Sequence, residues 1–308
     1  MRSLSQVCGT NVFKQCVSYA ISVKSFGEDT KNFESVGILM IATNGYLERW
    51  FDTATGIEQH AFLEAKRVSI HLFTNRVDEA QRWVELNLRR VHLITHKIKG
   101  WGWPEATLFR YQFFVEASEA ISEKLLMYCD SDMLIKEDFG NLLEPETWIG
   151  GIAFVQHPGF FRNSGIKSLI DYFMNPRLLG PLVQAKIARS PGLGSWENSR
   201  SSTAYLELKE RKNYVHGAVW FGKQDPVMKM CKLLAENIRK DLSSGYIAKW
   251  HDESHLNCYL GKYGGSILSN ELSGVSDYRH LNKFNSRIIT AKKSSGEGRK
   301  LTEFDSDA

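Results

Sequence analysis

Residues 125–132 read Leu-Leu-Met-Tyr-Cys-Asp-Ser-Asp, an apolar run that ends in two acids separated by one serine. Such a short apolar run is typical of a strand that is buried on both faces, as in a parallel sheet covered by helices. Open α/β sheets bind their ligands at the carboxyl ends of such strands. The stretch therefore predicts an α/β protein with a ligand site at Asp130 and Asp132.

The chemistry of these two acids favours a divalent cation. Two carboxylates held this close repel each other, and a cation between or beside them relieves the repulsion. All-oxygen ligation suits Mn²⁺ or Mg²⁺ better than a metal that prefers thiolates. Such a cation can bridge a diphosphate and neutralise the charge that develops as the diphosphate leaves. The alternative is a solvated turn in which Asp132 caps a local backbone group.

Segments that flank this stretch alternate between strand and helix. The alternation favours an α/β sandwich with a largely parallel sheet. A helix is expected to begin at Pro104, because proline is tolerated at the first helical position and Leu108, Tyr111 and Val115 follow at helical spacing. The other expected elements are strands over residues 36–42, 68–73, 90–98, 152–155 and 215–221, and helices from residue 46 to about 66, over 226–239 and over 252–263.

Composition limits the function classes. The chain has 308 residues, and 39 Lys+Arg minus 35 Asp+Glu leaves a net charge of +4. This small charge does not indicate a nucleic-acid partner, and 43% apolar residues exclude wholesale disorder. There is no run of about 20 apolar residues and no signal-peptide pattern. The 5 cysteines are scattered without a CxxC pair, so we expect a reduced, cytoplasmic protein.

A second group of chemical interest is the stretch Trp-His-Asp-Glu-Ser-His at residues 250–255. Asp252 could be a helix N-cap, and Glu253 a favourable charge in the first turn. His251 and His255 are four residues apart and could share a zinc ion, although zinc hydrolases of the zincin type place Glu directly after the first His. The third interpretation is a carboxylate that acts on a reacting carbon or positions a sugar.

Three further positions have both a structural and a functional interpretation. Arg110 is either a surface residue or a fixed cation that faces the acidic motif. His157 follows an expected strand and is either a satisfied polar residue or a ligand contact. The basic residues Lys293 and Arg299 of the tail are either solvated or able to fold over phosphates.

Five fragments, taken in their order along the chain, resemble glycosyltransferase family 6. They read Gly-Trp-Pro-Glu at 102–105, Cys-Asp-Ser-Asp-Met at 129–133, His-Pro-Gly-Phe at 157–160, Ser-Thr-Ala-Tyr at 202–205 and Trp-His-Asp-Glu-Ser-His-Leu-Asn at 250–257. The resemblance covers about residues 36–299. It implies a GT-A fold, with residues 1–34 as an N-terminal extension, 35–290 as a single Rossmann-like catalytic domain, and 291–308 as a tail that closes over UDP.

The activity that the resemblance implies is transfer of a hexose from a UDP sugar. Anomeric configuration is retained, and the product has an α-1,3 linkage to a galactose-type acceptor on a saccharide or glycolipid. By position, Glu253 matches the catalytic carboxylate, and Asp130 and Asp132 match the Mn²⁺ ligands. His157 and Trp250 fall on acceptor-binding positions. The donor-binding positions are Ile41, Ala42, Tyr46, Arg110, Asp130, Ser131, Asp132, His216, Gly217, Ala218, Asp252, Lys293 and Arg299.

The segment His216-Gly217-Ala218 bears on the choice of donor. The family reads the substituent at sugar carbon 2 with this segment, and a glycine at its third position admits an acetamido group. Ala218 removes about one methyl of room, which can cost on the order of 1–3 kcal/mol for the larger sugar. We therefore expect UDP-galactose as donor, with UDP-N-acetylgalactosamine as the alternative.

Departures from the family pattern fall in the acceptor region. Residues 196–199 read Trp-Glu-Asn-Ser where the family has Tyr-Glu-Arg-Arg, and residues 162–194 look longer than their counterpart. The identity of the acceptor therefore stays open. Without the membrane anchor of animal enzymes, we expect a soluble member of bacterial or viral type, and peripheral membrane contact stays open. The rival classes are a zinc hydrolase using His251 and His255, and a nucleotide-sugar-binding protein without catalysis.

Overall fold

The computed structural model describes residues 33–160, 194–275 and 286–291. All of them belong to the compact unit Asn32–Ala308. A seven-stranded sheet runs through this unit in the order β3-β2-β1-β4-β7-β6-β8. Its strands are β1 (Val36–Ile41), β2 (Val68–Thr74), β3 (Val91–Lys97), β4 (Leu125–Cys129), β6 (Ile152–Gln156), β7 (Val215–Lys223) and β8 (Ser266–Leu268).

The sheet is mixed but mainly parallel. Strands β3, β2, β1 and β4 are parallel neighbours, while β7 is antiparallel to both β4 and β6. The antiparallel register pairs Cys129, at the end of β4, with Val219 of β7. Because of this reversal, the first residues of β7 lie beyond the carboxyl end of β4. The expected α/β fold with a mainly parallel sheet is confirmed.

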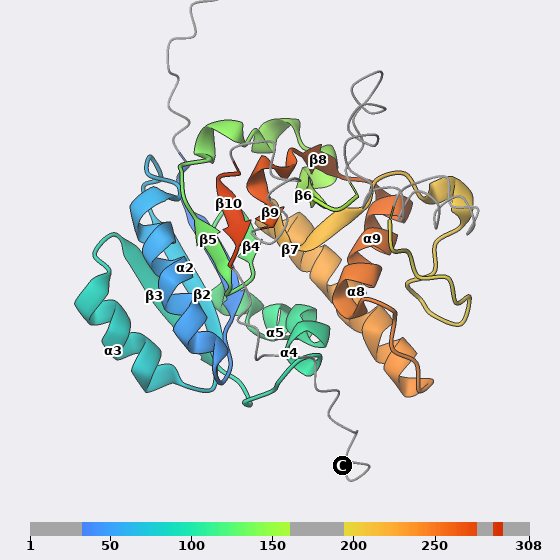
Figure 1. Ribbon diagram of the computed structural model, residues 1–308, viewed down its shortest axis with the longest axis horizontal. Coiled ribbons are helices and arrows are strands. Elements are labelled where there is room, and N and C mark those ends of the chain that lie inside the picture. The colour runs from blue at the N-terminus through green and yellow to red at the C-terminus, as the bar shows by residue number, and fades with distance from the viewer. Residues whose placement is uncertain (1–32, 161–193, 276–285, 292–308) are drawn as a thin grey trace, which may run out of the picture. The chain divides into compact units, whose positions relative to one another are not determined.

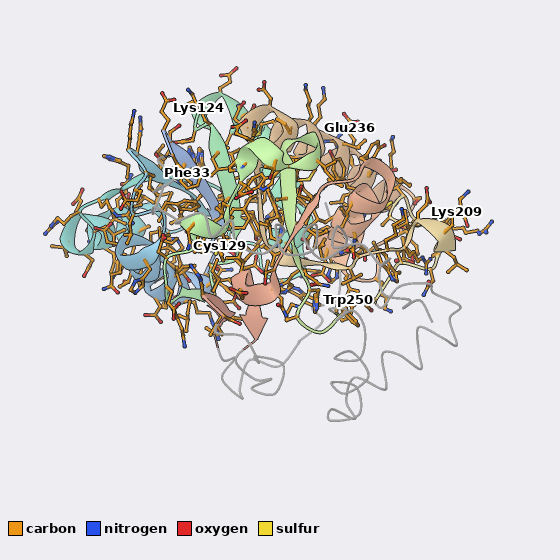
Figure 2. All side chains as sticks on the ribbon, turned by 90° about the horizontal axis from the view of Figure 1, so that it is seen from above. Phe33, Lys124, Cys129, Lys209, Glu236 and Trp250 are labelled. Atoms are coloured by element: carbon orange, nitrogen blue, oxygen red, sulfur yellow. The ribbon has the colours of Figure 1, made fainter. Side chains whose placement is uncertain are left out.

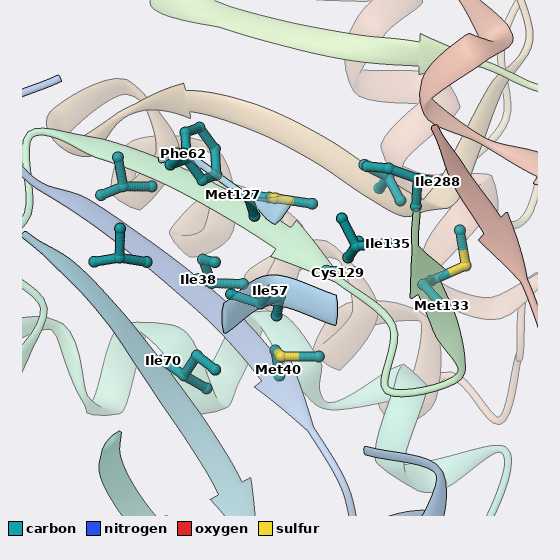
Figure 3. Close-up of a cluster of buried hydrophobic side chains, with 14 of the residues drawn as sticks. Ile38, Met40, Ile57, Phe62, Ile70, Met127, Cys129, Met133, Ile135 and Ile288 are labelled. Carbon is teal, nitrogen blue, oxygen red and sulfur yellow. The ribbon is translucent and has the colours of Figure 1, made fainter. Parts of the chain in front are cut away.

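Helices cover both faces of the sheet (Figure 1). They are α2 (Tyr46–His60), α3 (Val77–Asn87), α4 (Glu105–Leu108), α5 (Arg110–Glu116), α8 (Gln224–Ser243) and α9 (His251–Tyr263). Side chains of a strand point alternately to the two faces. In β1, Ile38 and Met40 pack with Ile57 of α2 in one core, and Leu39 packs in a second core with α5 and α8. Figure 3 shows the first core, where Ile38, Ile70 and Met127 from three neighbouring strands lie near Ile57.

A second, three-stranded sheet adjoins the acidic motif. It consists of β5 (Met133–Ile135), β10 (Ile288–Thr290) and β9 (Gly274–Val275), in that order. Its apolar side chains Met133, Ile135 and Ile288 extend the first core (Figure 3). The backbone N–H of Ala291 donates to the carbonyl of Asp132 at 2.7 Å. The chain therefore leaves β10 beside the acidic motif.

Several expected boundaries were wrong. Helix α2 ends at His60, not near residue 66. The helix expected from Pro104 is divided into α4 and α5 at Phe109, whose ψ of 6° departs from helical geometry. Helix α3 and the short strands β5, β8, β9 and β10 were not expected from the sequence. The strands expected over 36–42, 68–73, 90–98, 152–155 and 215–221 are present with shifts of one or two residues at their ends.

Candidate functional site

A cleft of about 640 Å³ opens at the carboxyl ends of β1 and β4. Six segments line it, namely the loop after β1, residues 101–103, Thr107 and Arg110 of α4 and α5, Asp130, the start of β7 and the start of α9. Beside it lies a cavity of about 170 Å³ that is lined by Ile41, Ser131 and Asp132 and shares Tyr46, Arg110 and Asp130 with the cleft. The fold therefore brings the acidic motif and the Trp-His-Asp-Glu stretch, more than a hundred residues apart, to one hollow.

Arg110 connects the two acidic segments. Its guanidinium lies 3.4 Å from a carboxylate oxygen of Asp130 and 3.1 Å from one of Asp252, and it donates to the carbonyl of Gly217 at 3.0 Å. The ring of Tyr128 lies beneath it, with 4.4 Å between the guanidinium carbon and the ring centroid. Burial disfavours the cation, but the nearby carboxylates outweigh burial and raise the pKa of Arg110. The side chain is therefore a permanent buried cation at the wall of the cleft.

The side chain of Asp252 is nearly as buried as that of Arg110, with which it pairs. Burial raises the pKa of Asp252 to about 7, and the charges of Asp130 and Glu253 add to this, while Arg110 opposes it. The carboxyl is thus balanced between its protonated and ionised forms near neutral pH. A group in that state can donate or accept a hydrogen bond from a hydroxyl in the cleft.

Glu253 is held by a donor on each carboxylate oxygen. The phenol of Tyr214 donates to Oε1 at 2.8 Å, and the backbone N–H of Gly217 donates to Oε2 at 2.8 Å. Gly217 is the residue that allows this approach, since a Cβ there would meet the Cβ of Glu253 at 3.1 Å and Oε2 at 3.3 Å. Two fixed donors define the orientation of the carboxylate.

Asn257 ties α9 to β7 below the carboxylate. Its amide oxygen accepts from the N–H of Val215 at 2.8 Å. Its amide nitrogen donates to the carbonyls of Val215 at 3.0 Å and Glu253 at 2.9 Å. One buried side chain thereby fixes the start of β7 against the first turn of α9, where the site residues lie.

Two histidines, His157 and His216, lie close to Glu253. The rings of His157 and His216 meet edge to face with centroids 4.8 Å apart. Burial lowers the pKa of each to about 4, so both are neutral at physiological pH. The Nδ1 atom of His157 accepts from the N–H of Gly159, and the Nδ1 atom of His216 is bonded to the hydroxyl of Ser273.

Ligand atoms of His157, His216 and Glu253 lie within 4.8 Å of one another, as a metal site would require. However, Nδ1 of His157 accepts a backbone N–H and both oxygens of Glu253 already accept hydrogen bonds. A metal there would have to replace these bonds. Among the described residues, this group does not include His251 or His255, the pair considered for zinc. His255 pairs with Asp241 at 3.6 Å, and His251 packs on Trp103.

The acidic motif fits a hard cation better. Asp130 and Asp132 both line the smaller cavity, so two carboxylates face the same space. One oxygen of Asp130 accepts from the hydroxyl of Tyr128, and the side chain keeps 32% of its surface exposed. The carbonyl of Ser131 accepts from Thr53 at 2.8 Å, which fixes the turn between the two acids. This all-oxygen set is the donor chemistry that Mn²⁺ and Mg²⁺ prefer.

The structure does not bring every expected residue to the cleft. Ala42 is fully buried in the first core and lines neither cavity. His157 packs against the ring of His216 and does not line the cleft, whereas Trp250, which is labelled in Figure 2, does. Lys293 and Arg299 lie outside the described residues. The site residues that reach the hollow are Ile41, Tyr46, Arg110, Asp130, Ser131, Asp132, His216, Gly217, Ala218, Trp250, Asp252 and Glu253.

Sequence reasoning missed four residues that support the site. Asn257 was part of the quoted motif but had no assigned role. Tyr128 and Tyr214 each stand two residues before an assigned residue, and their hydroxyls donate to Asp130 and Glu253. Nothing in the sequence around Ser273 indicated that its side chain would reach His216.

A comparison with protein families matches residues 177–294 to the model of glycosyltransferase family 6. Among curated proteins, the human globoside alpha-1,3-N-acetylgalactosaminyltransferase 1 is 26% identical over 77% of this chain and 60% of its own length. The histo-blood group ABO system transferase 1 of Rattus norvegicus is 24% identical over 73% of this chain and 56% of its own length. The O-antigen biosynthesis glycosyltransferase WbnI of Escherichia coli is 25% identical over 62% of this chain and 69% of its own length.

The mainly parallel sheet, with an acidic motif at the end of a central strand, defines an α/β protein of the GT-A class. The chain is similar to glycosyltransferase family 6, whose model matches residues 177–294, and to members of that family at 24–26% identity. It spans between a half and two thirds of the length of the animal relatives reported above. In the described ranges, no helix combines the length and the apolar character needed to cross a membrane.

Proposed function

We propose that the protein transfers a hexose from a UDP sugar to a hydroxyl of a saccharide acceptor, with retention of anomeric configuration and in α-1,3 linkage. The observation that carries this proposal is the shared cleft, in which Arg110 contacts both Asp130 and Asp252 and which Glu253 also lines. A diphosphate-linked sugar needs both a cationic site for its leaving group and a carboxylate near its anomeric carbon. The similarity to glycosyltransferase family 6 supports the same reaction class.

On the leaving-group side, UDP would occupy the smaller cavity. Ile41 and Tyr46 supply an apolar wall for the base and ribose. Asp130 and Asp132 would hold a Mn²⁺ or Mg²⁺ ion, which when bound would supply positive charge for the departing diphosphate. Arg110 adds a fixed cation at the same wall, and its charge is present at every physiological pH.

On the sugar side, Glu253 would support the anomeric carbon as it loses electrons to the leaving group. The donors from Tyr214 and Gly217 hold its carboxylate in one orientation. Asp252 would hold a hydroxyl of the donor sugar, since its carboxyl is fixed by Arg110 at 3.1 Å. Trp250 would contact the acceptor, and its indole N–H donates to the hydroxyl of Ser195 at 2.5 Å, whereas His157 does not line the cleft.

We assign UDP-galactose as the preferred donor and UDP-N-acetylgalactosamine as the alternative. Ala218 lines the cleft with little exposure, so its methyl narrows the space for a substituent at sugar carbon 2. The alternative donor is kept because two animal relatives are named as globoside alpha-1,3-N-acetylgalactosaminyltransferases. Residues 35–290 would form the catalytic domain, and the tail beyond Ala291 would close over UDP.

The test is a transfer assay with Mn²⁺, a panel of UDP sugars and simple β-galactosides, in which release of UDP and the sugar product are measured. Glu253→Gln is expected to abolish transfer while UDP affinity, measured by calorimetry, is kept. Asp132→Asn is expected to weaken UDP binding and to remove its dependence on Mn²⁺. Full transfer rates in both variants would contradict these roles, and UDP binding without any transfer by the unmodified protein would favour the non-catalytic alternative.

A further inference from the structure

The side chain of Ser273 is fully buried behind the cleft and contacts one residue of the donor site. Its Oγ lies 2.5 Å from Nδ1 of His216, and it has no other hydrogen-bond partner in the described part of the chain. The backbone of Ser273 is fixed, because it follows the 3₁₀ turn Asn270–Leu272 and its N–H donates to the carbonyl of Asn270 at 3.0 Å. The residue therefore faces His216 from a fixed position.

The partner geometry decides which nitrogen of His216 carries the proton. Because burial keeps the pKa of His216 near 4, the ring is neutral at physiological pH and has one N–H and one bare nitrogen. If Nδ1 carried the proton and donated to Ser273, the buried hydroxyl hydrogen would be left without an acceptor. A buried donor that has lost its hydrogen-bond acceptor destabilises the fold. The satisfied arrangement has the hydroxyl of Ser273 donating to Nδ1, which leaves the proton on Nε2.

We propose that Ser273 is a positioning residue for donor selection, which holds His216 as the Nε2–H tautomer so that the ring offers an N–H donor to an oxygen at carbon 2 of the donor hexose. The inference rests on the proposed function, since it assigns the substrate class of that same cleft. His216 lines the cleft beside Gly217 and Ala218, and Nε2 is the ring nitrogen that Ser273 leaves to a ligand.

This assignment distinguishes two donor chemistries. A 2-hydroxyl oxygen can accept from the N–H of His216 and still donate its own hydrogen elsewhere. An acetamido group places an N–H at the same carbon, so two donors would face each other. The methyl of Ala218 limits the room for the acetamido group to turn its carbonyl toward the ring. The protein would therefore select UDP hexoses that carry a free 2-hydroxyl.

The tautomer is measured directly by NMR of protein with ¹⁵N-labelled histidine, with His216→Gln used to assign the signals. The expected spectrum of the unmodified protein shows a protonated Nε2 and a bare Nδ1 for His216. A protonated Nδ1 would overturn the proposal. This measurement needs no donor, acceptor or activity, so its outcome is independent of whether the proposed function is right.

The second measurement is calorimetric binding of UDP-galactose and UDP-2-deoxygalactose in the presence of Mn²⁺. The unmodified protein should bind UDP-galactose about 10-fold more tightly, the value of one good hydrogen bond. In Ser273→Ala this ratio should fall toward 1, and Ser273→Thr, which keeps the hydroxyl, should restore it. The matched control is Ser269→Ala in the same segment, whose exposed hydroxyl caps the 3₁₀ turn and contacts no cleft residue.

The outcomes separate the two proposals. An equal loss of affinity for both donors in Ser273→Ala would show a merely structural role and would overturn the inference. An unchanged ratio in Ser273→Ala would overturn it as well. If the protein binds UDP-galactose with the expected ratio but transfers no sugar to any acceptor, the proposed activity fails while the role of Ser273 stands.

Discussion

Arg110 and Asp252 form a buried ion pair with 3.1 Å between guanidinium nitrogen and carboxylate oxygen. The pair joins α5 to α9, and the same guanidinium reaches Asp130 at the end of β4. The acidic motif and the first turn of α9 are therefore held together by one cation. Their mutual distance is a property of the folded protein before any ligand arrives, so a donor would meet a site that is already assembled.

The first prediction concerns the pH dependence of stability at Asp252. Its folded-state pKa is raised to about 7 by burial, whereas an unfolded aspartate titrates near about 3.9. Between these values the folded state binds the extra proton, so the contribution of Asp252 to the unfolding free energy is full below pH ~3.9 and falls as pH rises toward 7. Urea unfolding of the unmodified protein and of Asp252→Asn, at several pH values, measures it.

The comparison isolates the one group, since all other titrations are common to both proteins. The unfolding free energy of the unmodified protein minus that of Asp252→Asn should decrease from pH ~4 to 7 and level off above. A difference that increases over this range would mean that the carboxyl is stabilised as an ion, and that Arg110 outweighs burial.

The second prediction tests Tyr214 as the residue that positions Glu253. Tyr214→Phe removes the hydroxyl that donates to Oε1 at 2.8 Å but keeps the ring that packs against Trp196 and His157. The turnover of the transfer reaction should fall about 10-fold, the value of one hydrogen bond to a charged group. UDP affinity should stay within about 2-fold, because UDP would not contact this hydroxyl.

A thermal melt accompanies these measurements. If Tyr214→Phe lost turnover and UDP affinity together, with a large drop in melting temperature, the hydroxyl would support folding and would not act specifically on Glu253. Unchanged turnover would show that the backbone N–H of Gly217 holds Glu253 alone.

The sequence was sufficient to predict the strands that are buried on both faces of the sheet, because such strands are continuous apolar runs. The apolar run of β4 and the two acids after it predicted both a central strand and its ligand-binding end, and the long runs of β1 and β2 were predicted in the same way. Strands β5, β9 and β10 have two or three residues each, and they exist only because distant segments pair. Helix α3 fully buries only Ala80, with Trp83 and Val84 partly buried against the core, and sequence reasoning did not use this short pattern.

The site was predictable to the same extent. Asp130 and Glu253 stand in recognisable motifs, so their types and spacing pointed to chemistry. Their supporting residues did not, because hydrogen bonds such as those from Ser273 to His216 and from Tyr214 to Glu253 join positions 57 and 39 residues apart. A residue that acts through a partner this distant has no local pattern, and only the folded arrangement identifies it.

The third prediction concerns Asn257, which bonds to both backbone groups of Val215 and to the carbonyl of Glu253. Asn257→Leu keeps the approximate volume but leaves these buried groups unpaired, which should cost about 2–4 kcal/mol of unfolding free energy. Asn87→Leu on the exposed end of α3 is the matched control, with an expected change within about 0.5 kcal/mol. Urea unfolding measures both, and equal effects would refute the assignment of Asn257 as the link between β7 and α9.

The last prediction uses Gly217, whose missing side chain lets β7 approach Glu253. A methyl there would lie 3.1 Å from the Cβ of Glu253 and 3.3 Å from Oε2, so Gly217→Ala must push the carboxylate aside. Because a small displacement of a catalytic group can cost about 100-fold, transfer should fall by about 10- to 100-fold while calorimetric UDP affinity in the smaller cavity changes little. Gly140→Ala, whose added methyl meets its nearest neighbour at an ordinary 3.5 Å, controls for the cost of any glycine substitution. Equal transfer rates in the two variants would mean that Glu253 tolerates displacement, which is incompatible with a carboxylate that must face one carbon atom.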